Sequence, residues 1–245
     1  MIYFISDVHL GVYDDNIELE MQELFLAMLR NIKQNAEKIY LVGDIFDYWF
    51  DYKTVIPKKF FRILSAFYDL KKNHCEIEYL MGNHDFGHLD FFEKELNIPV
   101  HSGDIEREHY GKRFYISHGD GKDPSDKGYL LLKKVMRNPL SLKLYMKLHP
   151  NTGIGLASGS SKESRKYTQK KHYSEGDALF EFAKSKIDEG FDYVIMGHRH
   201  LASIQDYKSG KYINIGEWIK EPKIVSFDGN EIKHILVRNL VIGNQ

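Results

Sequence analysis

Short apolar runs separated by longer amphipathic stretches form the main pattern in the first two thirds of the chain. The runs are rich in Ile, Val, Leu, Tyr and Phe, which is typical of β-strands. Predicted strands cover residues 2–6, 38–42, 76–81, 113–117 and 192–196. Between the early strands, helices are predicted at about 17–34 and 58–72. The first half therefore indicates successive βαβ units.

The pattern changes after residue 200, where apolar and polar positions alternate. The segments "KYINIGEW", "KIVSFDG" and "EIKHILVR" alternate in this way, and "DGNE" has the composition of a hairpin turn. These segments predict antiparallel strands, so the expected fold class is α/β with mixed sheets. A length of 245 residues suits one sizeable domain, which we expect to span residues 1–245.

Composition narrows the class of protein. With 42% hydrophobic and 28% charged residues, the chain is expected to be globular. Cys75 is the only cysteine, which excludes an internal disulfide and fits a reducing compartment. No stretch approaches the roughly 20 apolar residues of a membrane-spanning helix, and we see no basic leader before Ile2. The expected location is the cytoplasm.

One segment of the chain is strongly basic. Residues 131–172 contain ten Lys and Arg against a single acid, Glu163, so the segment carries about +9 and the remainder of the chain about −10. Its first part, residues 129–148, predicts two amphipathic helices broken at Asn138 and Pro139. Composition alone favours a helical hairpin with an apolar face on the core and solvated lysines.

Each of five predicted strands is followed by a side chain that can bind a metal or move a proton. These side chains are Asp7 and His9, Asp44, the group Asn83, His84 and Asp85, His118, and the pair His198 and His200. The carboxyl ends of strands in open α/β sheets are where ligand crevices form. The pattern therefore predicts a shared site, although an isolated Asp at such a position would more often be a loop acid or a helix cap.

The donor types predict the chemistry of this site. Oxygen and nitrogen donors without thiolates favour Mn²⁺, Fe²⁺ or Zn²⁺. Seven candidate ligands are too many for one tetrahedral ion, whereas two ions that share a carboxylate account for all seven. Such a pair can clamp a phosphoryl group and activate water. Asp85 could orient a ligand or be a turn acid. The seven histidines outside these motifs are expected to be surface or packing residues.

In order and spacing, "DVHLG", "GDIFDYW", "GNHD", "SHGD" and "GHRH" resemble the signature motifs of calcineurin-like metallophosphoesterases. The resemblance implies mixed β-sheets packed as a sandwich and flanked by helices. It implies that Asp7, His9, Asp44 and His200 hold one ion, and that Asp44, Asn83, His118 and His198 hold the other. His84 would contact the phosphoryl group or help to protonate the leaving group, with structural support as its alternative role.

A closer resemblance is to the UDP-2,3-diacylglucosamine pyrophosphohydrolase branch, carried by "GDIFDYW", "HGDGKDPSDKGY" and "SSKESRKY". It implies a helical lid insertion at about 125–175. Substrate contacts are expected from Asn83, His84, Asp126, Tyr129, Ser161, Lys162, Arg165, Lys166 and His198. His84 is a departure, because much of this branch has Arg at that position.

The resemblance implies water attack on the α-phosphorus of UDP-2,3-diacylglucosamine, giving UMP and 2,3-diacylglucosamine 1-phosphate (lipid X) for lipid A synthesis. By this resemblance, two divalent ions would serve as cofactors, with Mn²⁺ as the expected metal and Fe²⁺ or Zn²⁺ as alternatives. The basic apolar insertion predicts peripheral contact with the cytoplasmic face of the inner membrane. No nucleic-acid partner or obligate protein partner is expected. The alternatives are a metallophosphoesterase for nucleotides, cyclic nucleotides, phospholipid-like diesters or phosphoproteins, and an inactive interaction module.

Overall fold

The computed structural model describes residues 1–157, 159 and 178–242 and contains two mixed β-sheets. The six-stranded sheet has the order β11-β10-β1-β2-β3-β4, and the five-stranded sheet has the order β5-β6-β7-β9-β8. The strands of the first sheet are β1 (Ile2–Ile5), β2 (Lys38–Val42), β3 (Glu76–Leu80), β4 (Val100–His101), β10 (Lys223–Phe227) and β11 (Ile232–Leu236). Those of the second are β5 (Ile105–His109), β6 (Lys112–Ile116), β7 (Tyr193–Met196), β8 (Ser203–Tyr207) and β9 (Gly210–Asn214).

The two sheets pack face to face through apolar side chains of their inner surfaces. Phe4 of β1 and Val42 of β2 belong to the same buried cluster as Phe114 of β6 and Ile195 of β7. Side chains alternate between the two faces of a strand, and here both faces are covered. The predicted strands are therefore nearly continuous apolar runs. This arrangement is the sandwich that the sequence led us to expect.

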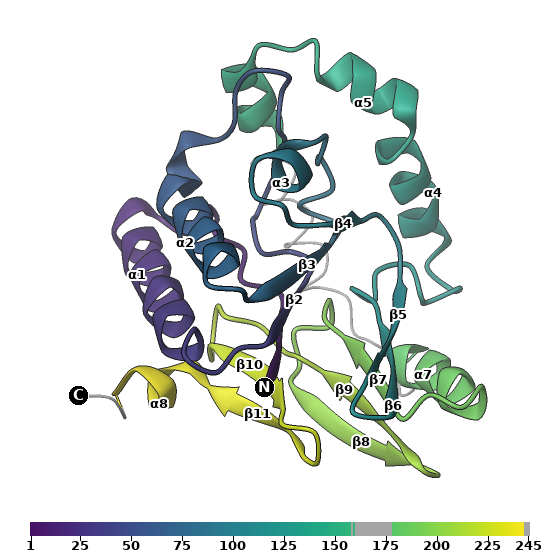
Figure 1. Cartoon of the computed structure of the whole chain (residues 1–245). Helices are drawn as coiled ribbons and strands as arrows, with labels where there is room; N and C mark the ends of the chain where they lie inside the picture. Colours follow the sequence, from purple (N-terminus) through teal and green to yellow (C-terminus); the bar gives the residue numbers. More distant parts are fainter. Residues whose placement is uncertain (158, 160–177, 243–245) are drawn as a thin grey trace.

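Helices cover the outer face of each sheet (Figure 1). Helices α1 (Asp15–Ile32) and α2 (Phe61–Lys72), the latter preceded by a 3₁₀ turn η1 (Lys58–Phe60), pack on the six-stranded sheet through residues such as Phe25 and Phe67. Helix α7 (Ala178–Asp188) packs on the five-stranded sheet through Leu179 and Ile187. Short helices α3 (Phe91–Lys94) and α8 (Val237–Ile242) complete these layers. The result is a helix–sheet–sheet–helix sandwich.

The predicted elements of the first half are confirmed. Strands β1, β2 and β3 are parallel neighbours, as successive βαβ units require. Strands β10 and β11 form the predicted antiparallel hairpin. Strand β9 contains the start of "KYINIGEW", which was predicted to be antiparallel to its neighbours. It is antiparallel to β8 but parallel to β7, so this prediction is correct for only one of the two neighbouring strands. Strands β5 and β8 were not predicted, because these edge strands of the five-stranded sheet carry mostly polar, partly exposed side chains.

The insertion begins with two helices, α4 (Lys127–Met136) and α5 (Pro139–Tyr145), separated at Asn138 as predicted. The Asn138 side chain accepts a hydrogen bond from the backbone N–H of Leu140 and so caps α5, while Pro139 occupies its first turn. Figure 1 shows α4 and α5 arching beside the body of the protein. That residues 1–245 form one domain stays a prediction. In the described part of the chain, no helix is both long and apolar enough to cross a membrane.

A buried ion network joins the edges of the two sheets and gives a prediction for acid stability. Glu78 on β3 lies 2.7 Å from the ammonium of Lys38, and it accepts hydrogen bonds from His101 at 2.8 Å and Arg107 at 2.5 Å. Burial raises the pKa of the Glu78 carboxyl, but His101, Arg107 and Lys38 outweigh burial and hold this pKa far below its usual value. The carboxylate therefore stabilises the folded state above its unfolded pKa of about 4.3 and loses this effect as the pH falls.

We expect Glu78→Gln to lower the free energy of unfolding at pH 7 by about 1–3 kcal/mol, because Lys38 and Arg107 lose the negative charge that they share. The difference from the wild type should shrink when the pH falls to about 3, because the unfolded wild-type chain then binds a proton at Glu78 while the folded carboxylate is still ionised. Urea unfolding at both pH values measures this. A difference that is constant or grows on acidification would contradict the role of the ionised carboxylate.

Candidate metal centre

The strand ends that carry the predicted ligands have an unusual backbone conformation. Nine residues other than glycine have positive φ in the described part of the chain. Five of them are predicted ligands, namely Asp7 (52°), His9 (53°), Asp44 (54°), His198 (67°) and His200 (57°). Residues with a Cβ atom rarely adopt this left-handed conformation, which persists only where the surrounding structure fixes it. At these positions, the left-handed conformation turns the backbone sharply just after a strand.

One group of side chains gathers beyond β1. His200 Nε2 lies 3.2 Å from Asp7 Oδ1 and 3.3 Å from His9 Nε2. His9 Nε2 lies 3.9 Å from both Asp7 Oδ1 and Asp44 Oδ2. The set Asp7, His9 and His200 offers atoms that all lie within 4.8 Å of one another. Together with Asp44, these three side chains are the four that the resemblance assigned to the first ion.

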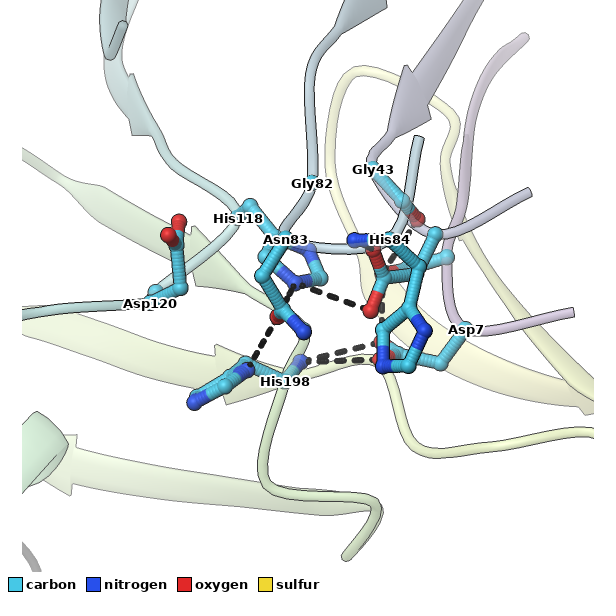
Figure 2. A network of polar contacts seen from close by, with 12 residues as sticks. Asp7, Gly43, Gly82, Asn83, His84, His118, Asp120 and His198 are labelled. Atoms are coloured by element: carbon cyan, nitrogen blue, oxygen red, sulfur yellow. Dashed lines mark hydrogen bonds and ion pairs between the residues drawn. The ribbon is translucent and has the colours of Figure 1, made fainter. Parts of the chain in front are cut away.

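A second group adjoins the first through Asp44. Figure 2 shows Asn83, His118 and His198 of this group. His118 Nε2 lies 3.4 Å from Asp44 Oδ2 and 3.1 Å from Asn83 Oδ1. Asn83 Oδ1 also lies 2.9 Å from His198 Nδ1. The structure therefore brings together all seven side chains predicted as ligands, and Asp44 lies between the two groups.

The donor set fits divalent ions. Asp7, His9 and Asp44 are at most 1% exposed, and two carboxylates so deep in a protein need positive charge close by. The Nδ1 atom of His118 meets the Val42 carbonyl oxygen at 2.9 Å, which leaves Nε2 to face Asp44 and Asn83. Oxygen and imidazole donors without thiolates suit Mn²⁺, Fe²⁺ or Zn²⁺. The described residues can therefore hold divalent metal ions.

Two glycines in the motifs allow the groups to approach so closely. A Cβ atom at Gly82 would collide with the Asp44 side chain, and one at Gly197 would collide with the side chains of Ser6 and Asp7. Any larger residue would displace a carboxylate of the cluster. The glycines of "GNHD" and "GHRH" are thus explained by space at the site.

In the metal-free protein, protons supply the positive charge that the carboxylates need. Burial lowers the pKa of His118, but the Asp44 carboxylate outweighs burial and raises this pKa to about 10. Burial likewise lowers the pKa of His200, whereas hydrogen bonds to Asp7 and Glu217 raise it to about 10. Burial raises the pKa of Asp7, but His200 outweighs burial and leaves it below its usual value. At neutral pH, two imidazolium groups therefore face two carboxylates.

This charge state predicts that metal binding releases protons. An imidazole must be neutral to bind a metal, so a divalent ion must displace a proton from His118 and another from His200. We expect about two protons to be released per chain near pH 7, and the apparent metal affinity to rise with pH. Calorimetric titration with Mn²⁺ in buffers of different ionisation enthalpy measures this number. A binding heat that does not depend on the buffer would contradict the expected proton release.

His84 lies at the edge of the cluster and faces a cavity. Its backbone N–H donates to Asp44 Oδ1 at 2.8 Å, and its ring packs edge-on against His9 with centroids 4.9 Å apart. Its Nδ1 lies 3.6 Å from Asp47 Oδ1. Asp47 is 2% exposed and therefore provides a buried carboxylate that orients the ring.

The cavity beside His84 has a volume of about 460 Å³ and extends from the metal-binding cluster to the insertion helices. Asn83, His84 and Asp47 line one end of it. The other end is mostly apolar. Its lining includes Phe50, Phe86, Leu132, Val135, Met136, Leu142, Tyr145, Leu156 and Ala157. Polar and apolar recognition groups therefore meet in one cavity.

The predicted substrate contacts fall into three groups. Tyr129 lines the cavity together with Asn83 and His84, and its hydroxyl donates to Asp120 at 2.9 Å. Asp126 caps α4 by accepting a hydrogen bond from the backbone N–H of Tyr129 at 3.2 Å. Neither Asp126 nor His198, which lies against Asn83, is among the cavity-lining residues. The predicted contacts Ser161, Lys162, Arg165 and Lys166 lie outside the described residues.

Several acids that support the site were not predicted from the sequence. Asp47 lies beside His84, Glu217 Oε2 lies 3.3 Å from His200 Nδ1, and Asp120 follows His118 by two residues. The second Asp of "GDIFD" and the acid of "GEW" were visible in the sequence, but only the fold brings them to the histidines. Asp85 was predicted either to orient a ligand or to be a turn acid. Its carboxylate accepts hydrogen bonds from the backbone N–H groups of Ile45 and Gly82, both at 2.8 Å, and thus fixes the loops that carry Asp44 and Asn83.

Comparison with known proteins agrees with this site. The family model described as calcineurin-like phosphoesterase matches residues 1–202. A UDP-2,3-diacylglucosamine hydrolase of Porphyromonas gingivalis is 36% identical over 251 residues, covering 94% of this chain and 95% of that protein. A protein of the same name from Haemophilus influenzae is 26% identical over 221 residues, covering 89% and 90%.

A solved structure described as a novel archaeal phosphodiesterase covers 96% of this chain and 98% of its own, with 17% identity and a TM-score of 0.49. The family match extends over more than half of the chain and includes all seven candidate ligands. The chain belongs to the calcineurin-like phosphoesterase family.

Proposed function

We propose that this protein hydrolyses UDP-2,3-diacylglucosamine between its two phosphates and releases UMP and 2,3-diacylglucosamine 1-phosphate. One observation carries the proposal: a single cavity joins the metal-binding cluster to the apolar side chains of α4 and α5. A substrate with phosphates at one end and acyl chains at the other needs both environments. The name shared by the relatives from P. gingivalis and H. influenzae supports the same substrate.

We propose two bound divalent ions, most simply Mn²⁺. Asp7, His9, Asp44 and His200 would hold one of them, and Asp44, Asn83, His118 and His198 would hold the other. When bound, such ions supply Lewis-acid chemistry, since they neutralise phosphate charge and make a water molecule more acidic. The shared position of Asp44 between the two groups supports this assignment.

In the proposed reaction, a water oxygen forms a bond to the α-phosphorus as the bond to the bridging oxygen breaks. The leaving group is a sugar phosphate, whose second pKa of about 6 makes it stable without a proton. His84 is therefore proposed to donate a hydrogen bond to a phosphoryl oxygen and to stabilise the charge that develops there. Asp47 holds the ring in position through its contact near Nδ1. No covalent enzyme intermediate is required.

We also propose that the insertion helices contact the cytoplasmic face of the inner membrane, where a lipid substrate would be found. Leu131, Leu140 and Leu144 are 66%, 65% and 57% exposed, and none of them lines the cavity. Exposed leucines among lysines on short helices suit the interface of an anionic membrane.

We expect the triple variant Leu131→Ser, Leu140→Ser and Leu144→Ser to bind vesicles of phosphatidylglycerol and phosphatidylethanolamine at least about tenfold more weakly, because buried apolar area contributes to interfacial binding. Vesicle sedimentation measures this binding. Phe61→Ser is the matched control, since Phe61 is 68% exposed on α2. Equal binding by the triple variant and the control would exclude the membrane role of these leucines.

The experiment that tests the proposed function is product analysis in detergent with Mn²⁺ and H₂¹⁸O. We expect release of UMP that carries the ¹⁸O label, because the proposed attack is on the α-phosphorus. Label in the sugar phosphate would place the attack on the other phosphorus. Cyclic nucleotides, phosphopeptides and a simple diester serve as parallel substrates. If UDP-2,3-diacylglucosamine gave no UMP while one of these parallel substrates was hydrolysed rapidly, the proposed substrate would be wrong.

A further inference from the structure

Two cationic side chains, Lys133 on α4 and Arg137 directly after this helix, line the cavity that is also lined by Asn83 and His84. We propose that Lys133 and Arg137 bind the phosphate that remains on the acylated sugar, and so determine a preference for diphosphates over simple diesters. This inference rests on the proposed function, because only a diphosphate substrate places a second phosphate there.

The two cations are held on one face of α4 by a buried acid. Tyr129, Lys133 and Arg137 are spaced four residues apart, so they share a face of the helix. Asp120, which is 6% exposed, accepts a hydrogen bond from the Tyr129 hydroxyl. Its Oδ2 lies 2.7 Å from Lys133 Nζ and 3.3 Å from Arg137 Nη2. Asp120 is therefore a positioning residue for both cations.

Among the described residues, the charges in this cluster do not balance. Asp120 is the one described acid within 4 Å of Lys133 and Arg137, so a single carboxylate faces two cationic side chains. A phosphate group would provide the missing negative charge and can accept several hydrogen bonds from ammonium and guanidinium donors.

The position of the cations matches that of the second phosphate. Arg137 Nη2 donates to the carbonyl oxygen of Gly82 at 2.7 Å, directly before Asn83 in the chain. Figure 2 shows Asp120, which holds the cations, on the opposite side of Asn83 from Asp7. A substrate whose α-phosphate lies at the metal-binding cluster would extend past Asn83 toward the apolar part of the cavity. Lys133 and Arg137 lie on this route.

The same contacts also attach α4 to the body of the protein, so the experiment must separate docking of the helix from recognition of phosphate. The test variants are Lys133→Gln and Arg137→Gln. Lys134→Gln is the matched control, because this substitution removes one positive charge from α4. Lys134 is exposed and does not line the cavity. Arg137→Lys keeps the charge and serves if Arg137→Gln fails to fold, as judged by thermal melting.

Two measurements are made in detergent. The first compares kcat/KM for UDP-2,3-diacylglucosamine with kcat/KM for bis(p-nitrophenyl) phosphate, a diester without a second phosphate. The second is calorimetric binding of 2,3-diacylglucosamine 1-phosphate to the metal-free protein. We expect both test variants to lower the ratio of the two kcat/KM values by about 10- to 100-fold and to weaken product binding similarly, whereas Lys134→Gln changes each by less than about threefold.

The failure of this inference differs from the failure of the proposed function. If the wild type releases UMP but the test variants lose both activities equally, or bind the product as Lys134→Gln does, the cations only dock α4 and the inference is overturned. If the wild type releases no UMP, the proposed function is overturned and the inference falls with it.

Discussion

The variant Asp44→Asn is expected to lose phosphodiester hydrolysis by roughly 1,000-fold or more, since a bound metal supplies several kcal/mol of charge stabilisation. Asp44 Oδ2 lies 3.4 Å from His118 Nε2 and 3.9 Å from His9 Nε2, so this carboxylate adjoins both groups of proposed ligands. Replacing it with a neutral amide weakens both positions at once. Steady-state kinetics with a simple diester and saturating Mn²⁺ measure the loss.

Thermal melting separates a loss of metal from a loss of folding. Mn²⁺ at about 100 times its dissociation constant should stabilise the wild-type fold by about 2.7 kcal/mol per site, because it binds the folded state. Asp44→Asn should melt cooperatively in EDTA and gain much less from Mn²⁺. An equal Mn²⁺-dependent stabilisation of both proteins would contradict the role of Asp44 as a shared ligand.

The variant His84→Ala should lower kcat by about 10²- to 10⁴-fold, the range typical of a side chain that acts on the transition state. The structure places His84 beside the cluster, with Asp47 3.6 Å from its Nδ1 and the cavity in front of it. Its removal should therefore leave Mn²⁺ binding largely intact. Kinetics combined with calorimetric Mn²⁺ titration distinguish these effects.

Two further variants define the role of His84. His84→Arg places a permanent cation where much of the resembled branch has Arg, and it should recover much of the activity that His84→Ala loses. His74→Ala removes an exposed histidine on the loop before β3 and should be fully active. If His84→Ala also lost bound Mn²⁺, His84 would be a ligand, as its proximity to His9 and Asp44 permits.

The sequence predicted much of the fold because the buried strands have a clear pattern. Strands β1 and β2 are covered on both faces, so they are almost continuous apolar runs, and β3 has three apolar residues beside Glu76 and Glu78. Strand β8 has the burial pattern of an edge, with exposed positions at alternate residues, and its composition does not distinguish it from a loop. Local sequence therefore predicts the centre of each sheet better than its edges.

The sequence predicted the candidate metal ligands, but it did not predict the acids that hold these ligands in position. Asp7, Asp44 and the histidines stand in short motifs at strand ends, so order and spacing were sufficient to predict them. Asp120 stands in "SHGD", but its contacts with Tyr129, Lys133 and Arg137 depend on how distant segments meet. The same holds for the contact of Glu217 with His200. The left-handed conformation at Asp7 and Asp44 likewise belongs to the folded site, since neither residue favours it as Gly would.

In the insertion, too, local sequence predicted the helices but not what their apolar faces contact. Its helical character and the break at Asn138 follow from local signals and are confirmed. Composition alone had favoured an apolar face packed on the core, whereas leucines such as Leu131 and Leu140 are exposed and Leu132 and Leu142 line a cavity. Spacing cannot distinguish a face that packs on a core from one that lines a cavity, because both are apolar at helical intervals.

Metal stoichiometry tests the central claim most directly. The protein is stripped with chelator, dialysed to equilibrium against Mn²⁺, and measured by elemental mass spectrometry with the protein concentration fixed by amino-acid analysis. Seven donors in two groups joined by one carboxylate predict two ions per wild-type chain. Saturation at one ion or fewer would contradict the dinuclear centre.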